Sequence, residues 1–463
     1  MCEGISKKMF ISDFSKCLKE RNATLFIGSG ISRNAQYAGW KDILKDCALS
    51  IGLDVEKESD LITLAEYYVR SRQRTKINIT IKDFFDNRKG NITEIHRIIA
   101  SLPLNDIWTT NYDTLIERSL DEAHKEYTVL TDDESYRNIN SKAGIKIHKI
   151  HGTVDEPNKC IITRSDYEKF QLTHDIVLSE LKGEMCSKSF LFMGYSFSDT
   201  DIQHILTKIR LTFDESHPIN HYTIVEKVKK GIKEKEEDYR YRLKKQEYHI
   251  RDMRTYGIET LLVDSYDEIK DILIEIRRKV YEDNILISGS YEIDSEFSNN
   301  ISSLVTKLSK ELIKKNYKII TGYGKNLGKN IVVGAYEGLD ETNKKFNENV
   351  SIFPFPYELN EELKVKKYNE IRLNMASISS IIIIIDGNNK NKEESGVYKE
   401  YELSKKQNNL VIPIPCFGQT AKQIYDELLL DTHYSDNEEF LNLNKETNED
   451  KIINIILKLI KGE

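Results

Sequence analysis

Cysteine and proline are scarce in this sequence, which has six cysteines and seven prolines among its 463 residues. No two cysteines are spaced as C-x-x-C, so we expect no structural zinc site and no other metal. Scattered single thiols fit a reducing compartment, where buried cysteines stay unpaired. We therefore expect a cytoplasmic protein whose cysteines are buried thiols.

Long apolar runs and an excess of positive charge are also absent. The longest aliphatic run, Ile381–Ile385, is far too short to span a bilayer. Met1–Lys8 is polar and lacks the apolar core of a signal peptide. The net charge of −7 argues against a broad electrostatic surface for nucleic acid. We expect neither a membrane nor a nucleic acid among the partners.

What the sequence does contain is a repeated alternation of apolar strand-like segments and helical segments. A first series begins with the strand predicted at 24–27, and a second series begins at Asn284. Apolar strands in such an alternation indicate parallel sheets that are covered on both faces. We predict an α/β protein with two Rossmann-like domains, residues 1–282 and 283–463.

Three predicted strand ends in the first domain carry groups suited to a ligand site. Gly28-Ser29-Gly30 would let a pyrophosphate approach bare backbone. Asn111 and Asp113 lie in the polar turn that ends a buried strand beginning at Asp106, and His151 follows an apolar strand that ends at Ile150. Each signal has a structural alternative, namely a tight turn, an Asx turn or a core histidine.

Taken together, these motifs resemble the sirtuin family over about residues 10–280. Gly28–Ser32 is similar to the family's G-A-G-x-S loop, and Thr110–Asp113 is similar to its T-Q-N-x-D motif without the glutamine. Ile150–Gly152 is similar to its histidine-glycine motif, and Gly194–Ser196 stands where the family has a later nucleotide turn. The resemblance implies a sirtuin-type sheet that binds NAD through Gly28, Ser29, Gly30, Ile31, Ser32, Thr110, Gly194 and Ser196.

The resemblance also implies roles in catalysis. Asn111 would position the ribose and an attacking water, His151 would act as general base, and Asp113 would orient its neighbours. Sirtuin deacylases usually carry a four-cysteine zinc module, whereas Cys160 and Cys186 stand alone here. Water is therefore the expected acceptor, and NAD+ is a substrate that yields ADP-ribose and nicotinamide. The alternatives are a zinc-free protein deacylase or ADP-ribosyltransferase, and a non-catalytic nucleotide-binding scaffold.

The second domain resembles the SLOG family, a group of Rossmann-like domains related to the LOG and DprA types. Gly396 and Glu400 match the last glycine and the glutamate of the G-G-x-G-T-x-x-E motif, and the remainder departs from it. This weakened motif favours binding over catalysis. The resemblance implies that a nucleotide effector is bound by Ser288, Gly289, Ser290, Gly322, Arg372, Lys390, Gly396 and Glu400.

A sirtuin-like domain followed by a SLOG domain is the arrangement of the NAD-hydrolysing effectors of the bacterial Thoeris antiphage system. That resemblance implies a TIR-domain partner protein that makes a cyclic ADP-ribose isomer. The isomer would bind the SLOG domain and switch on NAD depletion, in a homotetramer formed through the sirtuin-like domains. An off state is physically required, because an enzyme that always consumed NAD would kill its own cell.

Overall fold

The computed structural model describes residues 4–35, 37, 39–88, 90–138, 144–197, 200–213, 219–293, 297–356, 358–386 and 394–462. The chain divides into two compact units, Met1–Ile276 and Arg277–Glu463. This division falls inside helix α13 (Glu268–Val280), whereas the boundary expected from the sequence follows that helix. Each unit is described by itself below.

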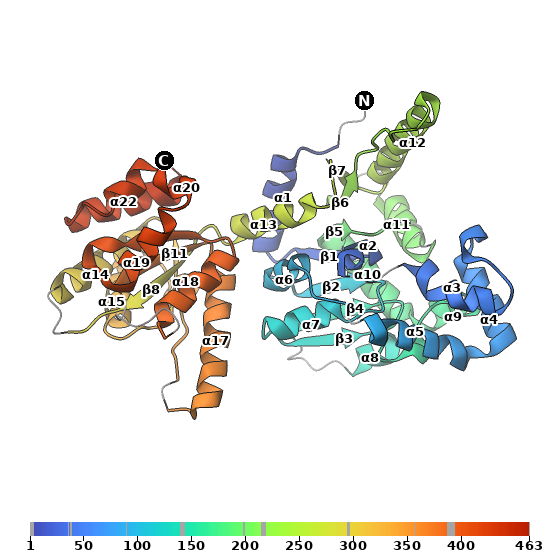
Figure 1. The fold of residues 1–463 in the computed structure, drawn as a ribbon, viewed down its shortest axis with the longest axis horizontal. Helices are drawn as coiled ribbons and strands as arrows, with labels where there is room; N and C mark the ends of the chain where they lie inside the picture. Colours follow the sequence, from blue (N-terminus) through green and yellow to red (C-terminus); the bar gives the residue numbers. More distant parts are fainter. Residues whose placement is uncertain are drawn as a thin grey trace. The chain divides into compact units, whose positions relative to one another are not determined.

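The described residues of the first unit form a seven-stranded sheet in which every strand pair is parallel (Figure 1). The strand order is β3-β4-β2-β1-β5-β6-β7. The strands are β1 (Ala23–Ile27), β2 (Asp106–Thr109), β3 (Tyr127–Leu130), β4 (Ile145–Lys149), β5 (Ser189–Met193), β6 (His221–Glu226) and β7 (Ile258–Val263). Because β1 pairs with β2 on one side and β5 on the other, the strand order reverses at β1, where open sheets of this kind bind ligands.

Helices surround this sheet, and several begin at side chains that cap them. Ser6, Asp60 and Thr163 each accept a hydrogen bond from a backbone N–H in the first helical turn. The helices of this unit are α1 (Lys7–Lys19), α2 (Ser29–Ser32), α3 (Trp40–Ser50), α4 (Leu61–Arg72), α5 (Arg74–Arg88), α6 (Glu94–Ser101), α7 (Leu115–Glu122), α8 (Asp133–Arg137), α9 (Arg164–Thr173), α10 (Asp175–Ser187), α11 (Thr200–Phe213), α12 (Glu236–Thr255) and α13.

The charged segment 227–254 is helical only from Glu236, where α12 begins. The preceding residues form a loop that the guanidinium of Arg242 holds in place. That guanidinium donates to Glu234 Oε1 at 2.7 Å and to the carbonyl of Lys229 at 2.7 Å. Side-chain bonds to the loop thus compete with helical backbone bonds.

The described residues of the second unit form a five-stranded parallel sheet in the order β10-β9-β8-β11-β12. The strands are β8 (Asn284–Ser290), β9 (Lys318–Thr321), β10 (Val350–Ile352), β11 (Ile381–Asp386) and β12 (Leu410–Ile414). The isoleucine run is β11, and all five isoleucines are buried. Alternate residues of a strand point to opposite faces, so both faces of this sheet are covered. Two parallel sheets confirm the predicted α/β class.

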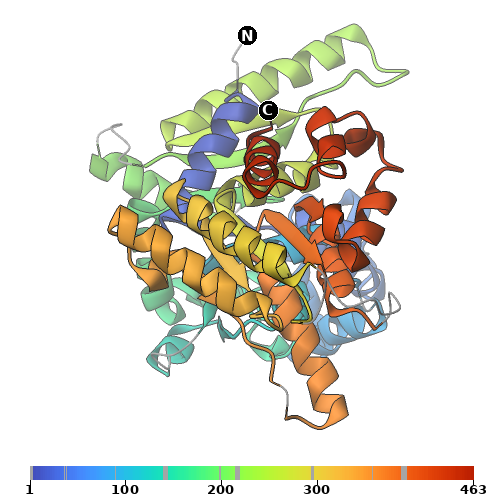
Figure 2. The same cartoon turned by 90° about the vertical axis from the view of Figure 1, so that its left-hand side faces the viewer.

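Helices lie on both sides of the second sheet, and α14 and α15 run side by side (Figure 2). Within the described ranges, no helix has the length and apolarity that a membrane crossing requires. The helices are α14 (Ser298–Lys314), α15 (Leu327–Thr342), α16 (Phe346–Asn349), α17 (Glu361–Ser377), α18 (Gly396–Lys406), α19 (Gln419–Leu428), α20 (Thr432–Ser435), α21 (Glu438–Asn442) and α22 (Glu449–Lys461).

Arg277 is a fully buried arginine at the start of the second unit. Its guanidinium donates to the carbonyls of Ala376, Ser377 and Ser379, where α17 ends, at 2.8–3.0 Å. It also donates to the carbonyl of Gln407, where α18 ends, at 2.7 Å. Burial lowers the pKa of Arg277 to about 10, so the group stays charged at neutral pH. One cation therefore satisfies the negative ends of two helices.

Candidate functional site

The predicted NAD-site residues follow four strands that are adjacent in the first sheet. Gly28–Ser32 follow β1, Thr110–Asp113 follow β2, His151 follows β4 and Gly194–Ser196 follow β5. Because β4, β2, β1 and β5 are consecutive neighbours and parallel, their carboxyl ends share one edge of the sheet. The fold thus brings all four motifs to the same edge.

The glycines of the first motif pack against the turn after β5. Gly28 N donates to Met193 O at 2.9 Å, and Gly30 N donates to Gly194 O at 3.0 Å. A Cβ atom on Gly28 would lie 2.4 Å from Gly194 O, and Gly194 itself has a φ of +63°. These glycines therefore have a packing reason that the sequence analysis missed.

The stretch after Gly28 is helical. Ser29–Ser32 form the single turn α2, with Gly28 as the residue that precedes it. Ser29 and Gly30 are exposed, whereas Ile31 and Ser32 are buried. Ser29 and Gly30 face solvent at the ligand edge of the sheet. Ser32 makes side-chain hydrogen bonds to residues that follow β2.

Ser32 belongs to a hydrogen-bonded chain of three side chains. The amide Nδ2 of Asn111 donates to Ser32 Oγ at 3.1 Å, and Ser32 Oγ donates to Asp113 Oδ2 at 2.8 Å. Asp113 Oδ1 accepts from the backbone N–H of Leu115, the first residue of α7, at 3.1 Å, as in an Asx turn. The buried Oδ1 of Asn111 has no hydrogen-bond partner among the described residues. The amide is therefore fixed in orientation, with its oxygen available to a ligand.

His151 lies in an aromatic environment that the sequence analysis did not foresee. Its ring meets Tyr167 and Phe170 edge to face, with centroid distances of 5.6 and 5.9 Å, and both rings come from α9. The backbone carbonyl of His151 accepts from Ile161 N at 2.9 Å. The imidazole is thus held in place by its backbone and by two rings. The sequence carried no signal for α9 beside this histidine.

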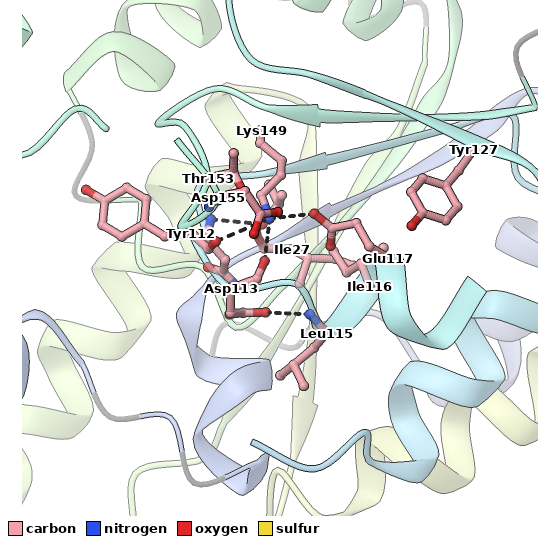
Figure 3. A network of polar contacts seen from close by, with 12 residues as sticks. Ile27, Tyr112, Asp113, Leu115, Ile116, Glu117, Tyr127, Lys149, Thr153 and Asp155 are labelled. Carbon is pink, nitrogen blue, oxygen red and sulfur yellow. Dashed lines mark hydrogen bonds and ion pairs between the residues drawn. The ribbon is translucent and has the colours of Figure 1, made fainter. Parts of the chain in front are cut away.

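A buried lysine and a buried glutamate lie against the loop that carries Asn111 and Asp113, and Figure 3 shows Lys149 and Glu117 beside Tyr112 and Asp113. Lys149 Nζ donates to Glu117 Oε1 at 2.7 Å and to the backbone carbonyls of Tyr112 and Asp113. Burial raises the pKa of Glu117. Sequence reasoning missed both residues, although a lysine that ends an apolar strand directly before Ile150 was a visible signal.

Among the described residues, Asp106, His148 and Glu184 form a group with metal-ligand chemistry. Asp106 is the first residue of β2, and Asn111 follows the last residue of that strand by two positions. The group therefore lies at the end of β2 opposite to Asn111. The ammonium of Lys188 lies 2.6 Å from each of the two carboxylates. The Lys188 ammonium thus supplies the positive charge that faces the carboxylates of Asp106 and Glu184.

In the second unit, a cavity of about 220 Å³ lies at the carboxyl ends of β8 and β9 and beside the start of α18. It brings together every predicted effector-binding residue except Lys390, which lies outside the described residues. The predicted residues that line it are Ser288, Gly289, Ser290, Gly322, Arg372, Gly396 and Glu400. Further lining residues that were not predicted include Lys325, Phe355 and Ser395.

Charge in this cavity is paired and partly removed from water. Glu400 Oε2 accepts from Ser288 Oγ at 2.6 Å, and Arg372 Nε lies 3.7 Å from Glu400 Oε1. Arg372 also lies over the rings of Phe355 and Tyr368, at 5.1 and 5.3 Å from their centroids. Burial raises the pKa of Glu400 and lowers the pKa of Arg372.

The start of α18 adds a positive dipole end to the same cavity. Ser395 Oγ accepts from Tyr398 N at 3.2 Å, which caps this helix of 11 residues. Gly396 is the first helical residue and lines the cavity. A buried arginine and a helix N-terminus together favour an anionic ligand.

Comparison with known proteins finds a matching family model for a part of each unit. A family model described as a SIR2-like domain matches residues 105–252, and one described as the Sir2- and TIR-associating SLOG family matches residues 268–463. These matches confirm the predicted order of a sirtuin-like domain and a SLOG domain.

Several relatives that match about nine-tenths of the chain or more share the name NAD(+) hydrolase ThsA. The protein of that name from Bacillus cereus (strain MSX-D12) is 34% identical over 429 residues, which cover 91% of this chain and 89% of the relative. The one from Enterococcus faecium is 36% identical and covers 92% and 91%. The one from Cytobacillus dafuensis is 33% identical and covers 93% and 90%.

Proposed function

The chain belongs to the family of ThsA NAD(+) hydrolases, and from this premise we propose that its first unit cleaves NAD+ when a nucleotide binds its second unit. The protein is an NAD+ hydrolase. The proposal concerns the residues that act, the ligand that activates and the biological setting. The observation that carries it is the buried amide of Asn111, fixed through Nδ2 and with Oδ1 lacking a hydrogen-bond partner among the described residues.

Cleavage breaks the bond between nicotinamide and ribose. Positive charge develops on the ribose as the bond breaks, as in glycoside hydrolysis, and nicotinamide leaves as a neutral molecule. The protein therefore needs to orient the ribose, exclude bulk water and admit one nucleophile. The products are ADP-ribose and nicotinamide.

Two side chains serve these needs in the proposed mechanism. Asn111 Oδ1 accepts a hydrogen bond from a ribose hydroxyl or from the attacking water. His151 accepts a proton from that water or hydroxyl, which suits an imidazole because its ordinary pKa lies near neutrality. Asp113 holds Ser32, and Ser32 in turn holds the Asn111 amide, so Asp113 orients the site.

The second unit is the proposed sensor, and its ligand is a cyclic ADP-ribose isomer. The cavity of about 220 Å³, the buried Arg372 and the N-terminus of α18 support an anionic nucleotide as the ligand. A ligand activates only to the extent that it binds the active state more tightly than the inactive state. The match of the second unit to the Sir2- and TIR-associating SLOG family supports a TIR-domain protein as the source of the isomer.

The setting we propose is bacterial antiphage defence, in which activated hydrolysis depletes cellular NAD. We further propose that the enzyme acts in the cytoplasm as a homotetramer. Neither nucleic acid nor a membrane has a role in this scheme, and no zinc is required.

Nicotinamide release from NAD+ by the purified full chain tests the proposal. Release that increases when a cyclic ADP-ribose isomer is added is the expected result. Failure to respond to each isomer in turn would overturn the sensor role. Release only in the presence of an acylated peptide would favour a zinc-free deacylase, and no release under any condition would favour a nucleotide-binding scaffold.

A further inference from the structure

Lys149 is the last residue of β4, and none of its side chain is exposed to solvent. Removing an ammonium group from water costs several kcal/mol unless hydrogen bonds and an opposite charge replace its hydration. Its three donors match three acceptors, namely Glu117 Oε1 at 2.7 Å, the Tyr112 carbonyl at 3.4 Å and the Asp113 carbonyl. Figure 3 shows these bonds converging on the ammonium group.

The two carbonyls belong to the residues that directly follow Asn111. On the other side of Asn111, the register of β2 and β4 places Thr109 beside Lys149. The backbone N–H of Ile150 donates to the Thr109 carbonyl at 3.1 Å. The end of β4 therefore holds the chain on both sides of Asn111, through its backbone before that residue and through the Lys149 side chain after it.

Glu117 balances the charge of the lysine. It lies in the first turn of α7 and is almost fully buried. A lone ammonium beneath this loop would oppose the positive charge that develops on the ribose during cleavage. The ion pair keeps the three donors of Lys149 in position and leaves no net charge below the site.

We propose that Lys149 and Glu117 form a positioning pair, which fixes the Asn111–Asp113 loop in the shape that cleavage of NAD+ requires. This inference rests on the proposed roles of Asn111 and Asp113. Neither residue of the pair contacts the substrate in this scheme. The pair acts through the backbone of the loop, so its loss lowers turnover rather than binding.

A double variant separates positioning from simple stability. Lys149→Met alone leaves Glu117 buried without its partner and is expected to lower the melting temperature. Lys149→Met combined with Glu117→Gln removes both charges, and a neutral replacement of a buried ion pair is often tolerated. We expect the double variant to regain stability, while kcat stays about 100-fold below wild type because the loop is misplaced.

The remaining readouts are KM and the single variant Glu117→Gln. We expect KM for NAD+ to stay close to wild type in the double variant. Glu117→Gln retains the lysine donors to both carbonyls and is expected to keep more turnover than the double variant. Lys146→Met changes a partly exposed lysine of the same strand and serves as the matched control.

Wild-type kcat in a double variant of restored stability would overturn the positioning role. Absence of nicotinamide release by the wild-type chain, with every cyclic ADP-ribose isomer, would instead count against the proposed function. If the methionine variants do not fold, Lys149→Arg decides the matter. It keeps the charge, but its planar guanidinium presents donors in a different geometry. Reduced kcat at an unchanged melting temperature supports positioning, and unchanged kcat refutes it.

Discussion

Arg372 and Glu400 form a buried ion pair in the cavity of the second unit, with the guanidinium Nε 3.7 Å from the carboxylate Oε1. Arg372 Nε is buried and has no hydrogen-bond partner among the described residues. The arginine is thus partly neutralised and still able to donate to a ligand. A phosphate group that binds here competes with Glu400 for the same cation.

Replacing Arg372 with alanine should weaken the response to the effector, so that more effector is needed for activation. A hydrogen bond between charged groups contributes about 1.5–3 kcal/mol, so the activating concentration should rise about 10- to 100-fold. The measurement is nicotinamide release as a function of cyclic ADP-ribose isomer concentration. Lys366→Ala, an exposed change on the same helix, is the control. An unchanged dose response in Arg372→Ala would place the effector site elsewhere.

Glu400→Gln should lower the effector concentration needed for activation, whereas Arg372→Ala should raise it. The amide can still accept the hydrogen bond from Ser288, but it no longer attracts Arg372 or repels a phosphate. We expect activation at a lower effector concentration, measured in the same assay. A higher required concentration would show that the carboxylate itself contacts the ligand favourably.

Asn111→Ala and His151→Ala should each abolish NAD+ hydrolysis while the protein stays folded. The expected loss in kcat is at least about 100-fold for a side chain that transfers a proton or positions the reacting groups. Turnover is followed by nicotinamide release and folding by the melting curve. His204→Ala, at an exposed position of α11, is the matched control. Normal turnover in either variant would contradict the assigned role.

The carboxylate of Glu66 makes the free energy of unfolding depend on pH. Hydrogen bonds from Ser165 N at 3.1 Å and from Arg70 at 2.8 Å stabilise its carboxylate and lower its pKa from 4.5 to about 2. A lowered pKa stabilises the folded state above pH 4.5, and this contribution is lost as the pH falls toward about 2.

The Glu66→Gln variant should therefore have a lower free energy of unfolding than wild type at neutral pH. The difference between the two free energies should become smaller as the pH falls. Urea unfolding at neutral pH and at about pH 4 tests this expectation. Glu237→Gln, an exposed change on α12, should show no such convergence. A difference that is the same at both pH values would mean that the ionised carboxylate is not the source of the stability.

Sequence reasoning worked best where local signals and tertiary packing agree. The longest aliphatic run that the sequence shows, Ile381–Ile385, forms the buried strand β11, which ends at the polar residue Asp386. Strand β3 and helices α8 to α10 were not predicted. The three helices mix charged and apolar side chains without a clear period, and the four residues of β3 are too few for a period to identify.

The candidate sites show the same limit. The resemblance to the sirtuin family implied that the strand ends carrying its motifs form one site, and parallel neighbours do align their carboxyl ends. It could not predict that Phe170 packs against His151 or that Lys149 lies beneath Asp113. A lysine in a strand is usually solvated, and the burial of Lys149 depends on the Glu117 carboxylate and on two backbone carbonyls.

Arg277 has a practical consequence for dividing the chain. A fragment that starts at residue 283 lacks this arginine, so the carbonyls at the ends of α17 and α18 lose their shared donor. Such a fragment should melt at a lower temperature than one that starts at residue 268, and calorimetry of the two can measure the difference. The last turns of α17 and α18 should then fray, although the cavity residues Arg372 and Glu400 are themselves present. Effector affinities measured on the shorter fragment would understate those of the intact sensor, so the longer fragment is the one to express.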